Sequence, residues 1–182
     1  MQLPQSGLIL DVGSCDATYL ASIQQPDRTL HCMDPRDCRA SIPVGAVFHG
    51  QSLIGNNLAP AHYDAVMFIS VLEHIGLPSY DQDAFPDGDR LALAEVWRLL
   101  KPGCPAIISV PAGQSKIASW YRQYSTGALH QLFRGWRAEF TYWGFDGVRY
   151  QPIPETDVEE YDYRDYPYVG AGALAGIVAY RS

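Results

Sequence analysis

The sequence is poor in basic residues, has no long apolar run, and shows no cysteine spacing typical of a metal site. It holds 13 Lys and Arg against 20 Asp and Glu, and the resulting formal net charge of −7 disfavours binding to a nucleic-acid backbone. No apolar run approaches the ~20 residues of a membrane helix. The first residues also lack the charged and apolar regions of a secretion signal. We therefore expect a cytoplasmic protein without nucleic-acid or membrane partners.

The cysteines are irregularly spaced, so we expect no metal site. They are Cys15, Cys32, Cys38 and Cys104. Free thiols are the default for such cysteines in a cytoplasmic protein. The chain has neither internal repeats nor low-complexity tracts. Its 182 residues, 47% of them hydrophobic, suffice for a single domain with a sizeable core over residues 1–182.

The most informative segment begins with the apolar residues 8–10 and continues as Asp11-Val12-Gly13. A buried strand that runs into a glycine turn and then a helix, here expected at residues 19–24, is typical of a nucleotide-binding α/β unit. Gly13 allows a tight turn and the close approach of a ligand. Cys15 and Ala17 stand where a dinucleotide site has further glycines, so a pyrophosphate cradle is poorly supported. The alternative is that Gly13 only shapes the turn.

A second acid, Asp34, stands at the end of the next expected strand, residues 29–33. It follows Asp11 by 23 positions, close to the roughly 20 residues between a glycine turn and a ribose-binding acid. A carboxylate at this point can accept hydrogen bonds from both ribose hydroxyls. The alternative is that Asp34 is a turn residue before Pro35.

Strands and helices alternate along the chain. Further strands are expected at residues 46–49, 63–70, 106–110, 138–145 and 171–180, and further helices at residues 90–100 and 125–136. Pro111 is expected to end the fifth strand. The alternation predicts a doubly wound α/β sheet of seven strands, mostly parallel with an antiparallel last strand. Ligands bind outside the carboxyl ends of such strands, which points to residues 13–17, 34–36, 50–53, 70–74 and 111–113.

The order of these segments resembles the class I S-adenosylmethionine-dependent methyltransferases, whose fold is Rossmann-like. The resemblance rests on residues 11–13, Asp34, residues 50–53, residues 63–74 and the helix end at residues 99–103. It implies S-adenosyl-L-methionine as the cofactor. The cofactor-binding residues that it implies are Asp11, Gly13, Cys15, Asp34, Pro35, Gln51, Ser52, Leu53 and Ser70.

A narrower resemblance concerns a group of bacterial methyltransferase-like proteins, some of which accompany glycan biosynthesis. It rests on residues 73–77, Tyr80, residues 86–89 and residues 110–113. The sequence departs from the broader family at Cys15, where a second glycine is usual, and at Gln51, where an acid is frequent. The expected first strand begins at Leu8, which leaves no room for the usual N-terminal helix or lid. We therefore expect an open site, or one completed by a second subunit or a partner chain.

A sulfonium carries an activated methyl group, so the protein must align a nucleophile and, for a hydroxyl, remove its proton. His74 is the candidate base, because it follows the fourth strand and has a pKa near neutrality. Glu73 could orient His74 or bind the amino group of the cofactor. The alternatives are that His74 packs against the end of the sheet or caps the next helix, and that Glu73 is an acid favoured at a helix start.

Aromatic and acidic residues are the candidates for binding the acceptor. Tyr80, Trp120 and Tyr121 could line its pocket, although helix packing explains the last two equally well. The acids near Tyr80, at positions 81, 83, 87 and 89, are more typical of a solvated loop and helix cap than of a metal site. Residues 155–168 contain six acids and four tyrosines, which could stack on a sugar or form a subunit interface.

Three functions follow. The first is a methyltransferase acting on a small polar acceptor, by O-methylation of a sugar or related metabolite. The second is a non-catalytic S-adenosylmethionine-binding or scaffold protein. The third, a nucleotide-dependent oxidoreductase, is disfavoured by the glycine-poor turn.

Overall fold

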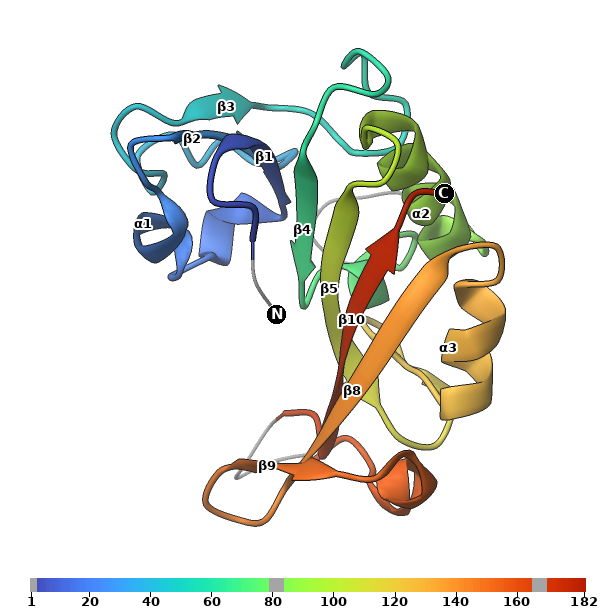
Figure 1. Cartoon of the computed structure of the whole chain (residues 1–182). Helices are drawn as coiled ribbons and strands as arrows, with labels where there is room; N and C mark the ends of the chain where they lie inside the picture. Colours follow the sequence, from blue (N-terminus) through green and yellow to red (C-terminus); the bar gives the residue numbers. More distant parts are fainter. Residues whose placement is uncertain (1–2, 79–83, 165–169) are drawn as a thin grey trace.

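The structure is a computed structural model that describes residues 3–78, 84–164 and 170–182 (Figure 1). Its main sheet has eight strands in the order β3-β2-β1-β4-β5-β10-β8-β9. The strands are β1 (Gly7–Val12), β2 (Arg28–Met33), β3 (Val47–His49), β4 (Ala65–Ile69), β5 (Pro105–Ala112), β8 (Arg137–Phe145), β9 (Tyr150–Ile153) and β10 (Ala173–Tyr180). The strands β1 to β5 pair in parallel, whereas β10 is antiparallel to both β5 and β8.

This architecture confirms the doubly wound α/β prediction, with one strand more than expected. The extra strand, β9, pairs antiparallel with the end of β8. It carries Pro152, which cannot donate to a ladder and is therefore confined to edges. A four-residue edge strand with a proline gives little signal in the sequence.

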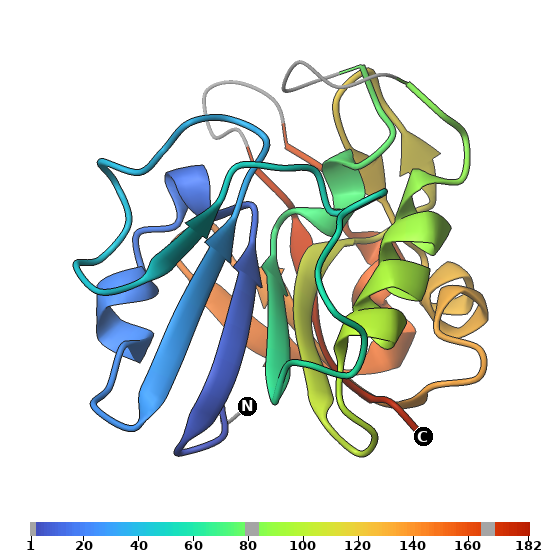
Figure 2. The same ribbon diagram turned by 90° about the horizontal axis from the view of Figure 1, so that it is seen from above.

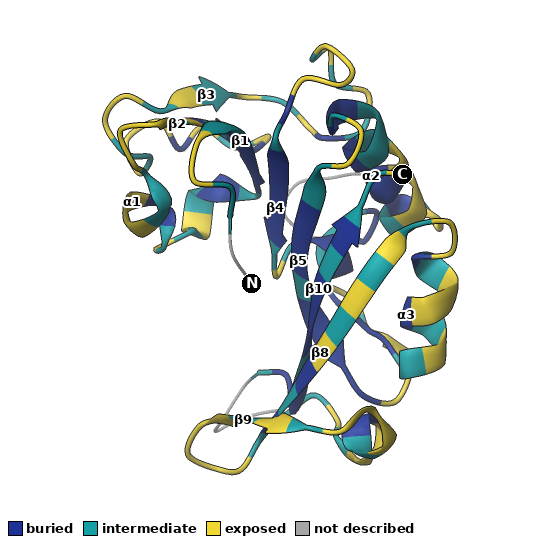
Figure 3. Ribbon diagram, viewed as in Figure 1, coloured by how far each residue is buried: buried dark blue, intermediate teal, exposed yellow. Residues whose placement is uncertain are grey.

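Helices cover both faces of the sheet (Figure 2). On one face, α2 (Gly88–Leu99) and α3 (Thr126–Leu132) pack on alternate side chains of the strands, such as Leu10 and Phe68. On the other face, α1 (Leu20–Ile23) packs on the intervening residues, including Ile9 and Met67. The central strands are therefore buried on both sides, whereas β8 and β9 are more exposed (Figure 3).

Pro111 does not end the fifth strand, contrary to the prediction. β4 pairs with β5 only as far as Ser109, and β10 continues the pairing through Pro111 to Ala112. The carbonyl of Pro111 accepts from Tyr124 N at 3.1 Å, so this residue points its backbone groups away from β10. The missing N–H is consequently not needed for the ladder.

The loops at the carboxyl ends of the strands contain several short elements. They are the 3-10 turns η1 (Ser14–Asp16), η2 (Leu72–His74) and η3 (Glu155–Glu160), and the hairpin of β6 (Lys116–Ile117) and β7 (Arg122–Gln123). None of the helices in the described ranges is long and apolar enough to cross a membrane.

Candidate functional site

A cavity of about 240 Å³ opens at the carboxyl ends of β1, β2 and β4, where a ligand is expected in such sheets. Eight of the candidate residues line it: Gly13, Asp34, Pro35, Gln51, Ser52, Leu53, Ser70 and His74. Asp11, Cys15 and Glu73 are not among the lining residues. Three further polar residues line the cavity: Tyr19, and Asp16 and Arg36, which belong to the segments 13–17 and 34–36 where a ligand was expected.

Gly13 forms the turn that leads from β1 into η1. Its backbone is left-handed, with φ 79°, and its N–H donates to Met33 O at 2.8 Å. A Cβ at this position would clash with Cγ2 of Val71 in the loop after β4. The absence of a side chain therefore lets the loops after β1 and β4 approach each other beside the cavity.

Asp11 is fully buried and does not line the cavity, but it holds the side chain of Tyr19, which does. One of its carboxylate oxygens accepts from Tyr19 OH and the other from Ser14 Oγ, both at 2.7 Å. Burial raises the pKa of Asp11 to about 6, although these two hydrogen bonds oppose the shift. The carboxylate therefore fixes the hydroxyl of Tyr19, which does line the cavity.

Asp34 is 2% exposed and lies at the end of β2. Its Oδ1 accepts from the backbone N–H and the Nε of Arg36, and its Oδ2 accepts from Arg36 Nη2 and Cys15 N. These four distances are between 3.0 and 3.1 Å. Arg36 Nη2 also reaches Asp16 Oδ2, at 3.0 Å. The carboxylate is thus placed for a ribose but is engaged by an arginine.

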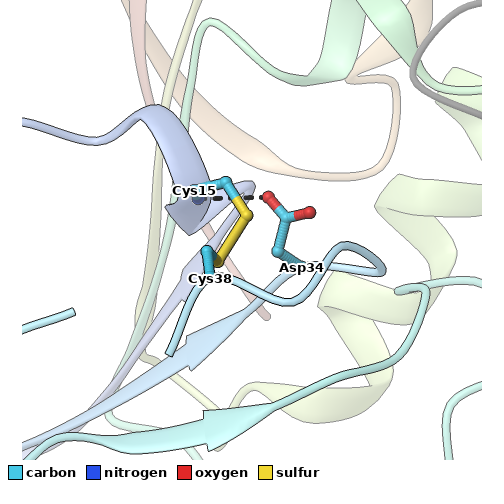
Figure 4. Close-up of side chains that lie close together, drawn as sticks. All are labelled: Cys15, Asp34 and Cys38. Carbon is cyan, nitrogen blue, oxygen red and sulfur yellow. Dashed lines mark hydrogen bonds between the residues drawn. A yellow bond between two sulfur atoms is a disulfide. The ribbon is translucent and has the colours of Figure 1, made fainter. Parts of the chain in front are cut away.

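Cys15 and Cys38 form a disulfide, which corrects the expectation that both are free thiols (Figure 4). Their Cα atoms are 5.2 Å apart although 23 positions separate them. The bond ties the loop after β2 to the turn after β1, next to Asp34. The sulfur atoms and the Asp34 carboxylate lie within 4.8 Å of one another, but a disulfide sulfur is not the thiolate that binds a metal. Cys32 and Cys104 are free thiols, as expected.

Ser70 closes the end of β4 in an unusual conformation. Its φ is 53°, a left-handed value that is uncommon outside glycine, and its N–H donates to Ser109 O at 3.0 Å. Strained backbone of this kind is concentrated at functional sites. Here it turns the chain directly from the sheet into the wall of the cavity.

His74 has its protonation state set by its neighbour Trp120. Nδ1 lies 2.5 Å from the backbone carbonyl of Trp120, which can only accept, so Nδ1 carries the hydrogen and Nε2 is the unprotonated nitrogen. Burial, together with the charge of Arg122, lowers the pKa of His74, and the Trp120 carbonyl only partly opposes this. The imidazole is therefore neutral at neutral pH.

Glu73 is 2% exposed and lies next to His74, on the side of Nε2. Its Oε1 is 3.8 Å from His74 Nε2, whereas its Oε2 is buried and makes no hydrogen bond within the described part of the chain. Burial raises the pKa of Glu73 to about 8. The carboxyl is thus protonated at neutral pH while the imidazole beside it is neutral.

Of the candidate acceptor residues, Trp120 and Tyr121 are not among those that line the cavity. Trp120 stands at the tip of the β6–β7 hairpin, is 37% exposed, and stacks on His74. Tyr121 is buried and stacks on Tyr163, with ring centroids 4.0 Å apart. Tyr80 lies outside the described residues, as do the acids at positions 81, 83 and 165 and the tyrosines at positions 166 and 168.

Arg122 positions the hairpin and was missed by the sequence analysis. Its buried guanidinium donates to Ile75 O at 2.6 Å, and its Nε lies 3.9 Å from the carboxylate of Asp89. Tyr124 OH donates to the same carboxylate at 3.2 Å. Asp89 therefore anchors the hairpin rather than belonging to a solvated loop. Asp87, at the start of α2, makes no side-chain cap.

No protein-family model matches the sequence, and no curated protein matches it. Several solved structures are similar to this chain. A 1,6-didemethyltoxoflavin-N1-methyltransferase of Burkholderia thailandensis with bound S-adenosylhomocysteine is 16% identical, with a TM-score of 0.65 over 97% of this chain and 72% of that one. An S-adenosylmethionine-dependent methyltransferase of Archaeoglobus fulgidus is 13% identical, with a TM-score of 0.65 over 97% and 87%.

The N-methyltransferase NodS of Bradyrhizobium japonicum, with bound S-adenosylhomocysteine, is 11% identical, with a TM-score of 0.58 over 97% and 80% of the two chains. At such identities the likeness establishes the fold alone. The chain has the fold of the S-adenosylmethionine-dependent methyltransferases.

Proposed function

We propose that this protein is an S-adenosylmethionine-dependent methyltransferase acting on a small polar acceptor. The observation that carries the proposal is the position of Asp34, a buried carboxylate at the end of β2 that lines the cavity beside the glycine turn. A carboxylate there is the group that recognises a ribose diol. The methyltransferase fold, with neighbours that hold S-adenosylhomocysteine, favours an adenosyl ligand over a dinucleotide.

The residues around the cavity fit the parts of that cofactor. Asp34 and Pro35 would lie at the ribose, and Gln51, Ser52 and Leu53 would lie at the adenine. Gly13, Ser70 and the hydroxyl of Tyr19, held by Asp11, would lie at the methionine part. Cys15 contributes through its backbone N–H, which holds Asp34. The cofactor supplies an activated methyl group on a sulfonium.

His74 would act as the general base for a hydroxyl acceptor. Its Nε2 takes the hydroxyl proton while the oxygen accepts the methyl group. The hydrogen bond from Nδ1 to Trp120 keeps the base in the correct tautomer. Glu73, protonated beside the neutral imidazole, would act as a positioning residue, because its Oε1 lies 3.8 Å from His74 Nε2.

The acceptor that we favour is a hydroxyl of a sugar or related metabolite, consistent with the resemblance to glycan-associated proteins. The exposed indole of Trp120 offers a stacking surface for such a ring beside His74. Ile117, 74% exposed on the same hairpin, would contact a second subunit or partner that completes this side of the site. The named N-methyltransferases among the neighbours make an amine acceptor the alternative to test.

A non-catalytic S-adenosylmethionine-binding or scaffold protein on the same fold is the second candidate. The engagement of Asp34 by Arg36, which occupies the groups that a ribose would use, favours the scaffold. Calorimetric titration with S-adenosylmethionine, S-adenosylhomocysteine and NAD tests binding, with Asp34→Ala as the control variant. Binding of the first two, lost in Asp34→Ala, supports the cofactor. Methyl transfer to a panel of hydroxyl and amine acceptors then separates the enzyme from the binding protein.

A further inference from the structure

Arg36 holds Asp34 in the way a ribose diol would. We propose that Arg36 is an internal competitor of the nucleoside: it occupies the diol-binding oxygens of Asp34 and must turn toward Asp16 before a ribose can bind. This inference rests on the proposed function, because it concerns how the same cavity selects its ligand.

The oxygens of Asp34 have no remaining capacity in the described structure. A carboxylate offers about four lone-pair positions. Two on Oδ1 accept from the backbone N–H and Nε of Arg36, and two on Oδ2 accept from Cys15 N and Arg36 Nη2. A ribose diol needs one position on each oxygen. The two side-chain hydrogen bonds of Arg36 occupy one position on each oxygen, as a diol would.

Asp34 cannot move to meet a ligand, but Arg36 can. Asp34 is fixed by Cys15 N at 3.1 Å, and the Cys15–Cys38 disulfide ties that turn to the loop after Asp34. The Asp34 side chain is 2% exposed, against 35% for Arg36. The movement that binding requires therefore falls to the arginine.

Asp16 provides the second position for the guanidinium. Its Oδ2 already lies 3.0 Å from Arg36 Nη2, and its side chain is 75% exposed at the rim of the cavity. By rotating outward, Arg36 would keep this ion pair while releasing both oxygens of Asp34. Movement of Arg36, which lines the cavity, would also enlarge a space of 240 Å³ that is small beside the roughly 300 to 1,000 Å³ of most ligand sites.

The competition defines the class of ligand that can enter. A single hydroxyl can replace only one of the two side-chain hydrogen bonds from Arg36 to Asp34. The loss of the other hydrogen bond is then not compensated. Two adjacent hydroxyls replace both bonds. The cavity should therefore select ribonucleosides over 2′-deoxyribonucleosides more strongly than an uncontested carboxylate would.

The test is calorimetric titration of Arg36→Ala with S-adenosylhomocysteine, a ligand without the sulfonium charge. We expect binding about three- to tenfold tighter than in the wild type, because two charge-assisted hydrogen bonds no longer need to be broken. Arg39→Ala is the matched control. Arg39 belongs to the same loop and pairs with Asp37 two residues earlier, but it is not among the lining residues. Its removal should leave the affinity unchanged.

Two further measurements separate competition from a general effect. Asp16→Asn should weaken binding about two- to fivefold, because Arg36 loses its outward partner. The 2′-deoxy analogue of S-adenosylhomocysteine should gain more from Arg36→Ala than the parent ligand does, because its single hydroxyl cannot replace both hydrogen bonds of Arg36 in the wild type. Thermal unfolding shows whether Arg36→Ala is folded. If it is not, Asp16→Asn still tests the proposal.

The outcomes are distinct for the two proposals. If the wild type binds S-adenosylhomocysteine while Arg36→Ala binds it equally or more weakly, the competitor role is overturned and the cofactor assignment stands. If neither protein binds it although both are folded, the proposed function fails together with this inference.

Discussion

The imidazole of His74 lies parallel to the indole of Trp120, with ring centroids 5.5 Å apart and 9° between the planes. The hydrogen bond from Nδ1 to the Trp120 carbonyl adds a second restraint, so the tip of the β6–β7 hairpin fixes both the position and the tautomer of the imidazole. Replacement of His74 by Ala should lower the methyl-transfer rate by a factor of about 10² to 10⁴ if it is the base. His130→Ala, which removes an exposed histidine paired with Glu155, is the control. An unchanged rate in His74→Ala would exclude the role.

The pH profile of the rate gives an independent check on His74. Because burial lowers its pKa, the imidazole stays neutral below the usual histidine value of 6.5. The acid limb of the rate should therefore lie below pH 6.5. A limb at or above that value would contradict the environment described for the base.

Glu73 should make the stability of the protein depend on pH. Its pKa is raised from 4.5 to about 8 in the folded state, so the folded protein holds a proton that the unfolded chain releases. The stabilisation is complete below pH 4.5 and is lost as the pH rises through 8. Glu73→Gln, which resembles the protonated carboxyl, should gain stability relative to the wild type over this range, by up to about 1.4 kcal/mol per pH unit.

Urea unfolding of the wild type and Glu73→Gln at pH 5 and pH 8 measures this difference. Glu139→Gln replaces an exposed glutamate on β8 and serves as the control. Equal pH dependence in all three proteins would show that Glu73 is ionised in the folded state at neutral pH.

The disulfide between Cys15 and Cys38 should contribute roughly 3 kcal/mol, since it closes a loop spanning 23 positions. Cys38→Ser should lower the Tm by about 6 to 12 °C in a chain of this size. Dithiothreitol should lower the wild-type Tm by a similar amount and leave that of Cys38→Ser unchanged. Cys104→Ser, which removes a free thiol, is the control. A wild-type Tm insensitive to the reductant would mean that the two sulfurs are not bonded in solution.

Gly13→Ala should destabilise the protein for two reasons, a left-handed backbone and a clash with Val71. We expect a loss of about 2 to 4 kcal/mol in the free energy of unfolding. Gly147→Ala separates the two causes, because Gly147 has φ 102° but nothing within 4 Å of its Cβ position. If both variants lose the same stability, the contact between the Gly13 turn and Val71 is not tight.

The sequence predicted the fold well because the strands of a buried parallel sheet are nearly continuous apolar runs. β4, with five residues of which four are fully or nearly buried, is the clearest case. β9 escaped prediction because an edge strand needs no such run. The helix over residues 125–136 was predicted too long: α3 ends at Leu132.

The site was predictable where the fold places residues at strand ends and unpredictable where distant loops meet. Gly13, Asp34 and Ser70 follow from their strands. Arg36 belongs to the expected ligand segment 34–36, but the sequence does not reveal that its guanidinium bonds to the Asp34 carboxylate inside the cavity. The Cys15–Cys38 bond depends on a loop that folds back over the turn, which spacing alone does not reveal.

The position of β10 between β5 and β8 affects how the chain folds during translation. Until residues 173–180 emerge from the exit tunnel, β8 has no neighbour on its inner side and β5 lacks its antiparallel partner. The half of the sheet that carries β1 to β5 can assemble earlier, because its pairings lie within the first 112 residues. Nascent chains should thus expose the inner edge of β8 to chaperones until β10 has emerged.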